Sequence, residues 1–139
     1  MGHRGAILAV RAHLAEALVN GDKGVEFRRA RPAFQAGDVI YVYATSPVQA
    51  IIGTFTCGRV IEGSPTKLWR DHANASEITR AHFRDYFNGS GKGYAIEVTN
   101  PEPWSRPLTL QDLRALIPGF HPPQSYRFLS DEFVLGGYR

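Results

Sequence analysis

The chain has 139 residues, close to the commonest size of one domain, and a hydrophobic fraction of 43%, enough for one sizeable core. Its 16 Lys and Arg exceed its 13 Asp and Glu by three, a mild bias towards polyanions that permits nucleic acid as a partner. We therefore expect a single domain over 1–139, with the folded core over about 5–130 and a loosely held tail over 131–139.

The composition also excludes several classes of protein. Cys57 is the only cysteine, so an internal disulfide is excluded and an intracellular, cytoplasmic protein is favoured. The apolar run over 6–10 is too short for the hydrophobic part of a signal peptide or for a membrane span. The five histidines and Cys57 share no metal-ligand spacing. We expect no metal, no cofactor and no membrane association.

Hydrophobic periodicity predicts a mixture of strands and helices. A buried strand over 6–10 leads into a helix over 12–20, which stops at Gly21. Further strands are predicted over 24–29, 38–43, 49–62, 93–98 and 126–129, and further helices begin at the caps Ser64, Thr79 and Thr109. Residues 30–37, 71–76 and 100–107 are typical of connections, and Gly53 and Gly58 of bulges in a bent sheet.

The densest chemistry lies over 21–31, where the first helix ends and a strand begins. Alternate side chains of a strand face opposite ways, so Glu26 and Arg28 are expected to point together, away from Val25 and Phe27. The spacing leaves the direction of Lys23 open, because this residue stands between two glycines where the backbone bends. Glu26 and Arg28 are then either an exposed surface pair of little energy or part of a polar site.

As a site, this stretch suits a nucleotide. Lys23 and Arg28, with Arg29 beside them, would hold phosphate through charge and forked hydrogen bonds. Glu26 would accept a hydrogen bond from a base amino group or from an attacking water. An aromatic ring at the rim would stack an unpaired base, worth about 1–3 kcal/mol, although a tryptophan on a short amphipathic helix is more often core. The predicted binding residues are Lys23, Glu26, Arg28, Arg29, Tyr43, Ser46 and Trp69.

These motifs together resemble the ASCH domain family, a branch of the PUA-like superfamily, over almost the whole chain. The resemblance is carried by Gly21-x-Lys23-x-x-Glu26-x-Arg28, Tyr43-Ala44-Thr45-Ser46-Pro47, Ile51-Ile52-Gly53, Leu68-Trp69, Phe83-x-x-Tyr86-Phe87, Ala95-Ile96-Glu97-Val98 and Pro122-Pro123-Gln124-Ser125-Tyr126. It implies an α+β fold, a PUA-like mixed β-barrel with helices packed at its edges. It also implies a cleft into which the lysine, glutamate and arginine of the first motif project.

The family is regarded as RNA-binding or RNA-modulating, and some members are hydrolases. The resemblance implies a domain that takes a single base or nucleotide, modified or unmodified, from RNA or another single-stranded nucleic acid. The alternative is a small metal-independent hydrolase, either a ribonuclease or an amidohydrolase on acylated cytidine, with Glu26 and Lys23 as its catalytic residues. The amidohydrolase branch carries threonine at the position of Glu26, which weakens transfer of its mechanism. A regulatory module with a protein partner is a third alternative.

Overall fold

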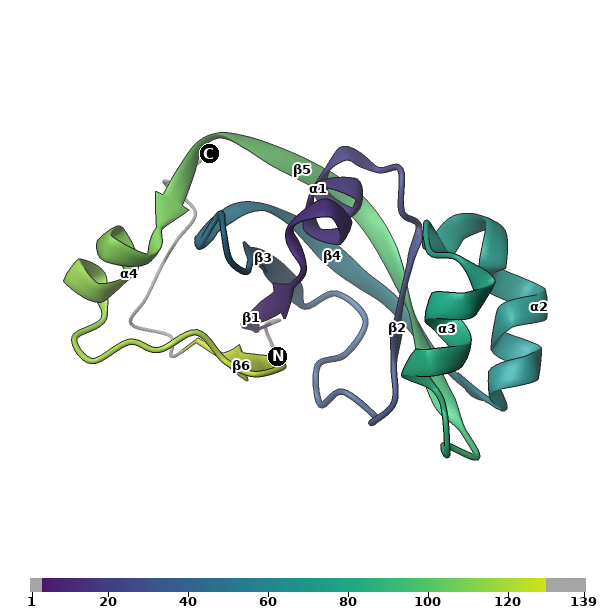
Figure 1. Ribbon diagram of the computed structural model, residues 1–139. Coiled ribbons are helices and arrows are strands. Elements are labelled where there is room, and N and C mark those ends of the chain that lie inside the picture. The colour runs from purple at the N-terminus through teal and green to yellow at the C-terminus, as the bar shows by residue number, and fades with distance from the viewer. Residues whose placement is uncertain (1–3, 130–139) are drawn as a thin grey trace.

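The computed structural model describes residues 4–129 (Figure 1), so the predicted tail over 131–139 lies outside the described residues. Along the described part, the elements are β1 (Gly5–Val10), α1 (Ala12–Asn20), β2 (Val25–Arg28), β3 (Val39–Ala44), β4 (Ala50–Gly63), α2 (Pro65–Ser76), α3 (Arg80–Tyr86), β5 (Gly93–Thr109), α4 (Leu110–Leu116) and β6 (Tyr126–Phe128). The strands form one mixed sheet in the order β2-β5-β4-β3-β1-β6, in which only β1 and β3 run parallel.

The sheet curves strongly along its two longest strands, β4 and β5 (Figure 1). Their pairing shifts register between Ile51 and Gly53 and again between Cys57 and Val60, which confirms the predicted irregularities at Gly53 and Gly58. A Cβ atom on Gly53 would lie 2.4 Å from the carbonyl oxygen of Glu102, so only glycine permits this approach. The edge strands β2 and β6 do not pair with each other, so the curved sheet stays open and forms a half-barrel.

Helix α1 lies inside the curve of the sheet (Figure 1). Its apolar stripe of Leu14, Ala15, Leu18 and Val19 packs into the main core with side chains of β1, β3, β4 and β5. The helix ends where predicted, because Gly21 adopts a left-handed conformation with φ 86° that glycine tolerates without strain. This turn aims the chain from α1 into β2.

Helices α2 and α3 pack together beside β2, at one end of the molecule (Figure 1). The predicted caps are confirmed: Ser64 accepts a hydrogen bond from the amide of Lys67, and Thr79 accepts one from the amide of His82. The predicted connection over 71–76 is wrong, because α2 continues to Ser76. Asp71 and Asn74 are exposed and mark a solvent face, while Ala75 packs against the core beneath.

The predicted loop over 100–107 is also wrong, because β5 runs on to Thr109. Its second half pairs with β4, as in the pairs of Gly53 with Pro103 and of Ile51 with Leu108. Strand β2 pairs with β5 only as far as Glu97, so this second half is a sheet edge. An edge tolerates prolines, because their missing N–H groups face no partner strand. Over residues 4–129, no helix combines the length and apolarity that a membrane crossing needs.

Candidate functional site

Strand β2 carries the densest polar cluster of the described chain. Val25 and Phe27 face the core beneath α2 and α3, and Glu26 and Arg28 face the opposite way, as the alternation predicts. Lys23 precedes the strand, and its side chain turns to the face of Glu26 and Arg28. The structure therefore brings Lys23, Glu26 and Arg28 together.

Glu26 lies between the two cations. Its Oε2 atom is 2.9 Å from Nη2 of Arg28, and its Oε1 atom is 3.6 Å from Nζ of Lys23. Lys23 also donates a hydrogen bond to the carbonyl oxygen of Ser76, at the C-terminal end of α2, where the helix dipole favours a cation. The side chains of Lys23 and Glu26 are only 1% and 8% exposed, so the cluster is not the exposed surface pair of the alternative interpretation.

The electrostatics of Lys23 follow from this burial. Desolvation lowers the pKa of Lys23, and the positive charge of Arg28 lowers it further, while Glu26 raises it in partial compensation. Because desolvation dominates, the ammonium group releases its proton more readily than that of an exposed lysine. The site thus combines a buried carboxylate with two cationic side chains.

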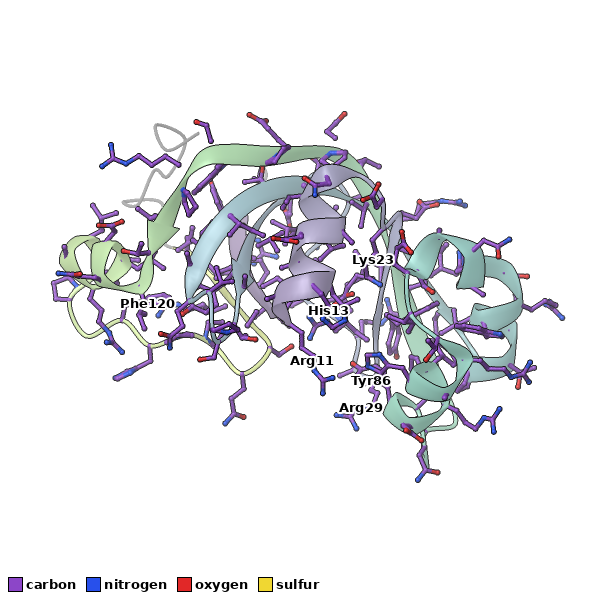
Figure 2. The ribbon with its side chains drawn as sticks, turned by 45° about the horizontal axis from the view of Figure 1, so that its top comes forward. Arg11, His13, Lys23, Arg29, Tyr86 and Phe120 are labelled. Atoms are coloured by element: carbon purple, nitrogen blue, oxygen red, sulfur yellow. The ribbon has the colours of Figure 1, made fainter. Side chains whose placement is uncertain are left out.

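The cluster forms the base of a pocket of about 190 Å³ between α1 and α3. Figure 2 shows Arg11, Lys23 and Tyr86 around this space. The remaining walls come from the end of β1, the first turn of α1 and one face of α3. The lining residues are Ala9, Val10, Arg11, Leu14, Lys23, Glu26, Phe27, Arg28, Ile78, His82 and Tyr86.

A second pocket of about 300 Å³ adjoins the first and shares Arg28 and Tyr86 with it. It adds Arg29, Gln124, Ser125 and Tyr126 to the lining. Arg28 holds the junction, because it donates to the carbonyl oxygen of Ala9 at 3.3 Å and to Oγ of Ser125 at 3.4 Å. We call the two pockets together the β2 groove.

The positive charge of the groove is not confined to its base. Arg11 and Arg29 are exposed at its rim, and the guanidinium of Arg29 lies 4.8 Å from the centre of the Tyr86 ring. Arg11 precedes α1, and within the described residues no side chain caps that helix end. The uncapped N–H groups add the positive end of the helix dipole to the same pocket, and such an end favours anions.

Three predicted residues do not line the β2 groove. Tyr43 is 1% exposed and packs in a separate core with Ile7, Trp104 and Leu108, because its position along β3 directs it to the other side of the sheet. Ser46 is exposed beyond the end of β3. Trp69 packs 5.0 Å from the Phe83 ring, between α2 and α3. The less buried aromatic residues that line the groove are Tyr86 and Tyr126, whereas Phe27 and Phe34 also line it but belong to the core.

Sequence reasoning missed several polar and aromatic residues of the groove, among them Arg11, His82, Tyr86, Ser125 and Tyr126. His82 and Tyr86 stand four apart on α3, so they share one face, a signal that was available once the cap at Thr79 was assigned. Tyr86 also follows Phe83 by three residues and precedes Phe87, a spacing typical of the buried side of a helix, and this spacing hides its place in the groove. Within residues 4–129, no group of three or more His, Cys, Asp or Glu side chains could hold a metal ion.

Fold and site together define an α+β half-barrel with helices at its edges and a basic groove beside the edge strand β2, which pairs with β5. The chain belongs to the ASCH domain family, whose domain matches residues 8–107. The predicted resemblance to this family and its PUA-like fold are confirmed.

One relative is an ASCH domain-containing ribonuclease from Zymomonas mobilis, 33% identical over 127 residues that cover 91% of this chain and 85% of the relative. The crystal structure of ASCH from Zymomonas mobilis has a TM-score of 0.90 at 32% identity and covers 93% of this chain and 90% of that one. The N-terminal domain of McrB from Staphylothermus marinus, with a TM-score of 0.60 at 12% identity over 95% and 91% of the two chains, shares the fold alone.

Proposed function

We propose that this protein binds single-stranded RNA and takes one nucleotide into the β2 groove. The observation that carries the proposal is the buried cluster of Lys23, Glu26 and Arg28 at the base of an accessible groove. Two cations beside one carboxylate leave a net positive charge, which suits a phosphate. Arg28 also offers a planar fork of donors, the geometry that a phosphate oxygen pair accepts.

The same groove offers contacts to a base. Each carboxylate oxygen of Glu26 can accept more than one hydrogen bond, so the residue keeps acceptor capacity beside its cation neighbours. Tyr86 and Tyr126 present aromatic rings in the two adjoining pockets. Stacking of an unpaired base on such a ring contributes about 1–3 kcal/mol. Single-stranded RNA presents its bases for both contacts, whereas the bases of a duplex are stacked inside it.

The ribonuclease from Zymomonas mobilis favours a second candidate, cleavage of the bound RNA. In this reading Glu26 takes the proton of the attacking hydroxyl, and Lys23 and Arg28 stabilise the negative charge that develops on the phosphate. The bond from the attacking oxygen to phosphorus forms as the bond to the leaving ribose oxygen breaks. His82, which lines the same pocket, is the candidate to protonate that oxygen.

The test is binding of a labelled single-stranded RNA, with duplex RNA of the same sequence for comparison, followed by gel analysis of the products. We expect tighter binding of the single strand and a loss of affinity between about 50 and 200 mM salt. If Lys23, Arg28 and Arg11 each contact a phosphate, the logarithmic salt slope is about −2. Absence of RNA binding at low salt contradicts both candidates, and binding without products contradicts cleavage alone.

As the pH rises, RNA binding is expected to weaken at a lower pH than the pKa of an exposed lysine would predict. Burial lowers the pKa of Lys23 below its ordinary value of 10.5, so a phosphate contact loses its charge as the pH rises through the lowered value. Between that value and 10.5 the unfolded chain binds the proton and the folded chain does not. In that window the contribution of Lys23 to the free energy of unfolding therefore rises with pH, and unfolding driven by Lys23 cannot explain the loss of binding.

The measurement is affinity for oligoadenylate from about pH 7 to about pH 9.5, below the ordinary lysine pKa. Adenine carries no proton that titrates in this range. The Lys23→Met variant is expected to bind more weakly at neutral pH and to lack the alkaline decline. An equal decline in wild type and variant would assign the effect to another group.

A further inference from the structure

A pocket of about 370 Å³ lies between α2 and α3 and shares no lining residue with the β2 groove. Trp69, Phe83 and Phe87 supply its aromatic wall, and Arg80 and Arg84 flank it. Trp69 is one of the two residues, with Tyr43, that the sequence suggested as a stacking platform, and it does not line the β2 groove. We call this second pocket the α2–α3 pocket.

Contacts between aromatic rings support the wall of this pocket. The ring centres of Trp69 and Phe83 are 5.0 Å apart and those of Phe83 and Phe87 are 4.6 Å apart. Phe83 and Phe87 are buried, at 5% and 4% exposure, whereas Trp69 is only half-buried. A supported ring with one accessible face is a suitable platform for an unpaired base.

The charges beside this wall are of one sign. Arg80 and Arg84 stand four apart on α3, so they lie on one face of the helix, and both are exposed. Within the described residues neither forms an ion pair, whereas the exposed Arg31, Arg59 and Arg70 each pair with a carboxylate. Two uncompensated guanidinium groups beside an aromatic ring match the alternation of phosphate and base along a nucleic acid strand.

Helix α3 separates the two binding surfaces. Ile78, just before the helix, and His82 and Tyr86 on it face the β2 groove. Arg80, Phe83, Arg84 and Phe87 face the α2–α3 pocket. A helix with its side chains is about 10–12 Å across, a distance that a strand of a few nucleotides covers. One RNA strand that crosses α3 can therefore reach both surfaces.

We propose that the α2–α3 pocket is a second contact for the same single-stranded RNA, in which a nucleotide next to the one in the β2 groove stacks on Trp69 while Arg80 and Arg84 hold the adjoining phosphates. The proposal rests on the proposed function, because the α2–α3 pocket would bind the part of the RNA strand that leaves the β2 groove. The proposed occupant of the pocket is RNA, and the test below also distinguishes RNA from a protein partner.

The test compares two RNA oligonucleotides, and single-stranded sites on one domain range from about 4 to 16 nucleotides. The short one, of about 2–3 nucleotides, fills the β2 groove alone, and the long one, of about 10 nucleotides, also crosses α3. The double variant Arg80→Ala/Arg84→Ala is expected to bind the long oligonucleotide about 10-fold more weakly and with a salt slope shallower by about 1.4. Its affinity for the short one is expected to stay unchanged. The matched control is Arg59→Ala/Arg70→Ala, which removes the same charge from paired arginines and is expected to change neither affinity.

A second readout follows Trp69 directly. The chain has two tryptophans, and Trp104 is buried at 8% exposure, so Trp104→Phe leaves Trp69 as the sole source of tryptophan fluorescence. The long oligonucleotide is expected to quench this signal and the short one to leave it unchanged, because stacking places a base against the ring.

The outcomes separate the two proposals. If wild type binds neither oligonucleotide, the proposed function fails. If wild type binds RNA but the arginine double variant binds the long oligonucleotide as well as wild type does, the second contact is overturned and the β2 groove stands. If the long oligonucleotide binds without a change in Trp69 fluorescence, the second contact is also overturned. A protein then becomes the candidate occupant of the α2–α3 pocket.

Discussion

Replacing Glu26 with alanine is expected to lower the free energy of unfolding by about 3–5 kcal/mol, because it leaves buried positive charge without a partner. Lys23 is 1% exposed and Arg28 is 17% exposed, and the carboxylate between them is the counter-charge within reach of both. Their separate hydrogen bonds, to Ser76 and to Ala9 and Ser125, satisfy donors and do not cancel charge.

The measurement is urea-induced unfolding of wild type, of Glu26→Ala and of the double variant Lys23→Met/Glu26→Ala. The double variant is expected to recover part of the loss, since it removes one of the two stranded cations together with the carboxylate. Glu62→Ala is the matched control, because Glu62 pairs with Arg31 at 3.0 Å on the surface and solvent screens the charges. Its urea midpoint is expected to stay close to that of wild type. A Glu26→Ala variant as stable as wild type would mean that solvent already compensates the cluster.

Local signals predicted the ends of most elements. The hydroxyl caps at Ser64, Thr79 and Thr109 each accept from the backbone amide three residues later, and Gly21 stops α1 through its own conformation. The wrong loop prediction over 100–107 came from tertiary context. The prolines after Asn100 were interpreted as a loop because the sequence does not tell which half of β5 is an edge.

In the candidate site, too, the features set by local sequence were predictable and those set by distant residues were not. The common direction of Glu26 and Arg28 is a property of four consecutive strand residues, so the sequence was sufficient to predict it. The direction of Lys23 depends on the carbonyl of Ser76, 53 residues further along the chain, and no local pattern carries that information. Ser125 reaches Arg28 across 97 positions of sequence for the same reason.

Replacing Arg28 with alanine is expected to weaken the binding of single-stranded RNA about 100-fold, corresponding to about 2.7 kcal/mol. Arg28 is shared by both pockets of the β2 groove, so a strand that fills them passes over its guanidinium. The replacement removes a charged donor, typically worth about 1.5–3 kcal/mol, and leaves Glu26 with Lys23 as its one cation partner within the cluster. The local charge then falls from +1 to zero, which no longer favours a phosphate.

Arg28→Lys separates charge from geometry at the same position. A lysine keeps the positive charge but is a single point of donors, so it cannot reproduce the fork that contacts Glu26 and Ser125 at once. We expect a loss of about 10-fold with the salt slope of wild type, whereas Arg28→Ala is expected to flatten the slope by about 0.7. Affinities are compared at temperatures where circular dichroism shows both variants folded. An equal loss for the two variants, with the slope unchanged in both, would mean that Arg28 positions the groove without contacting the phosphate.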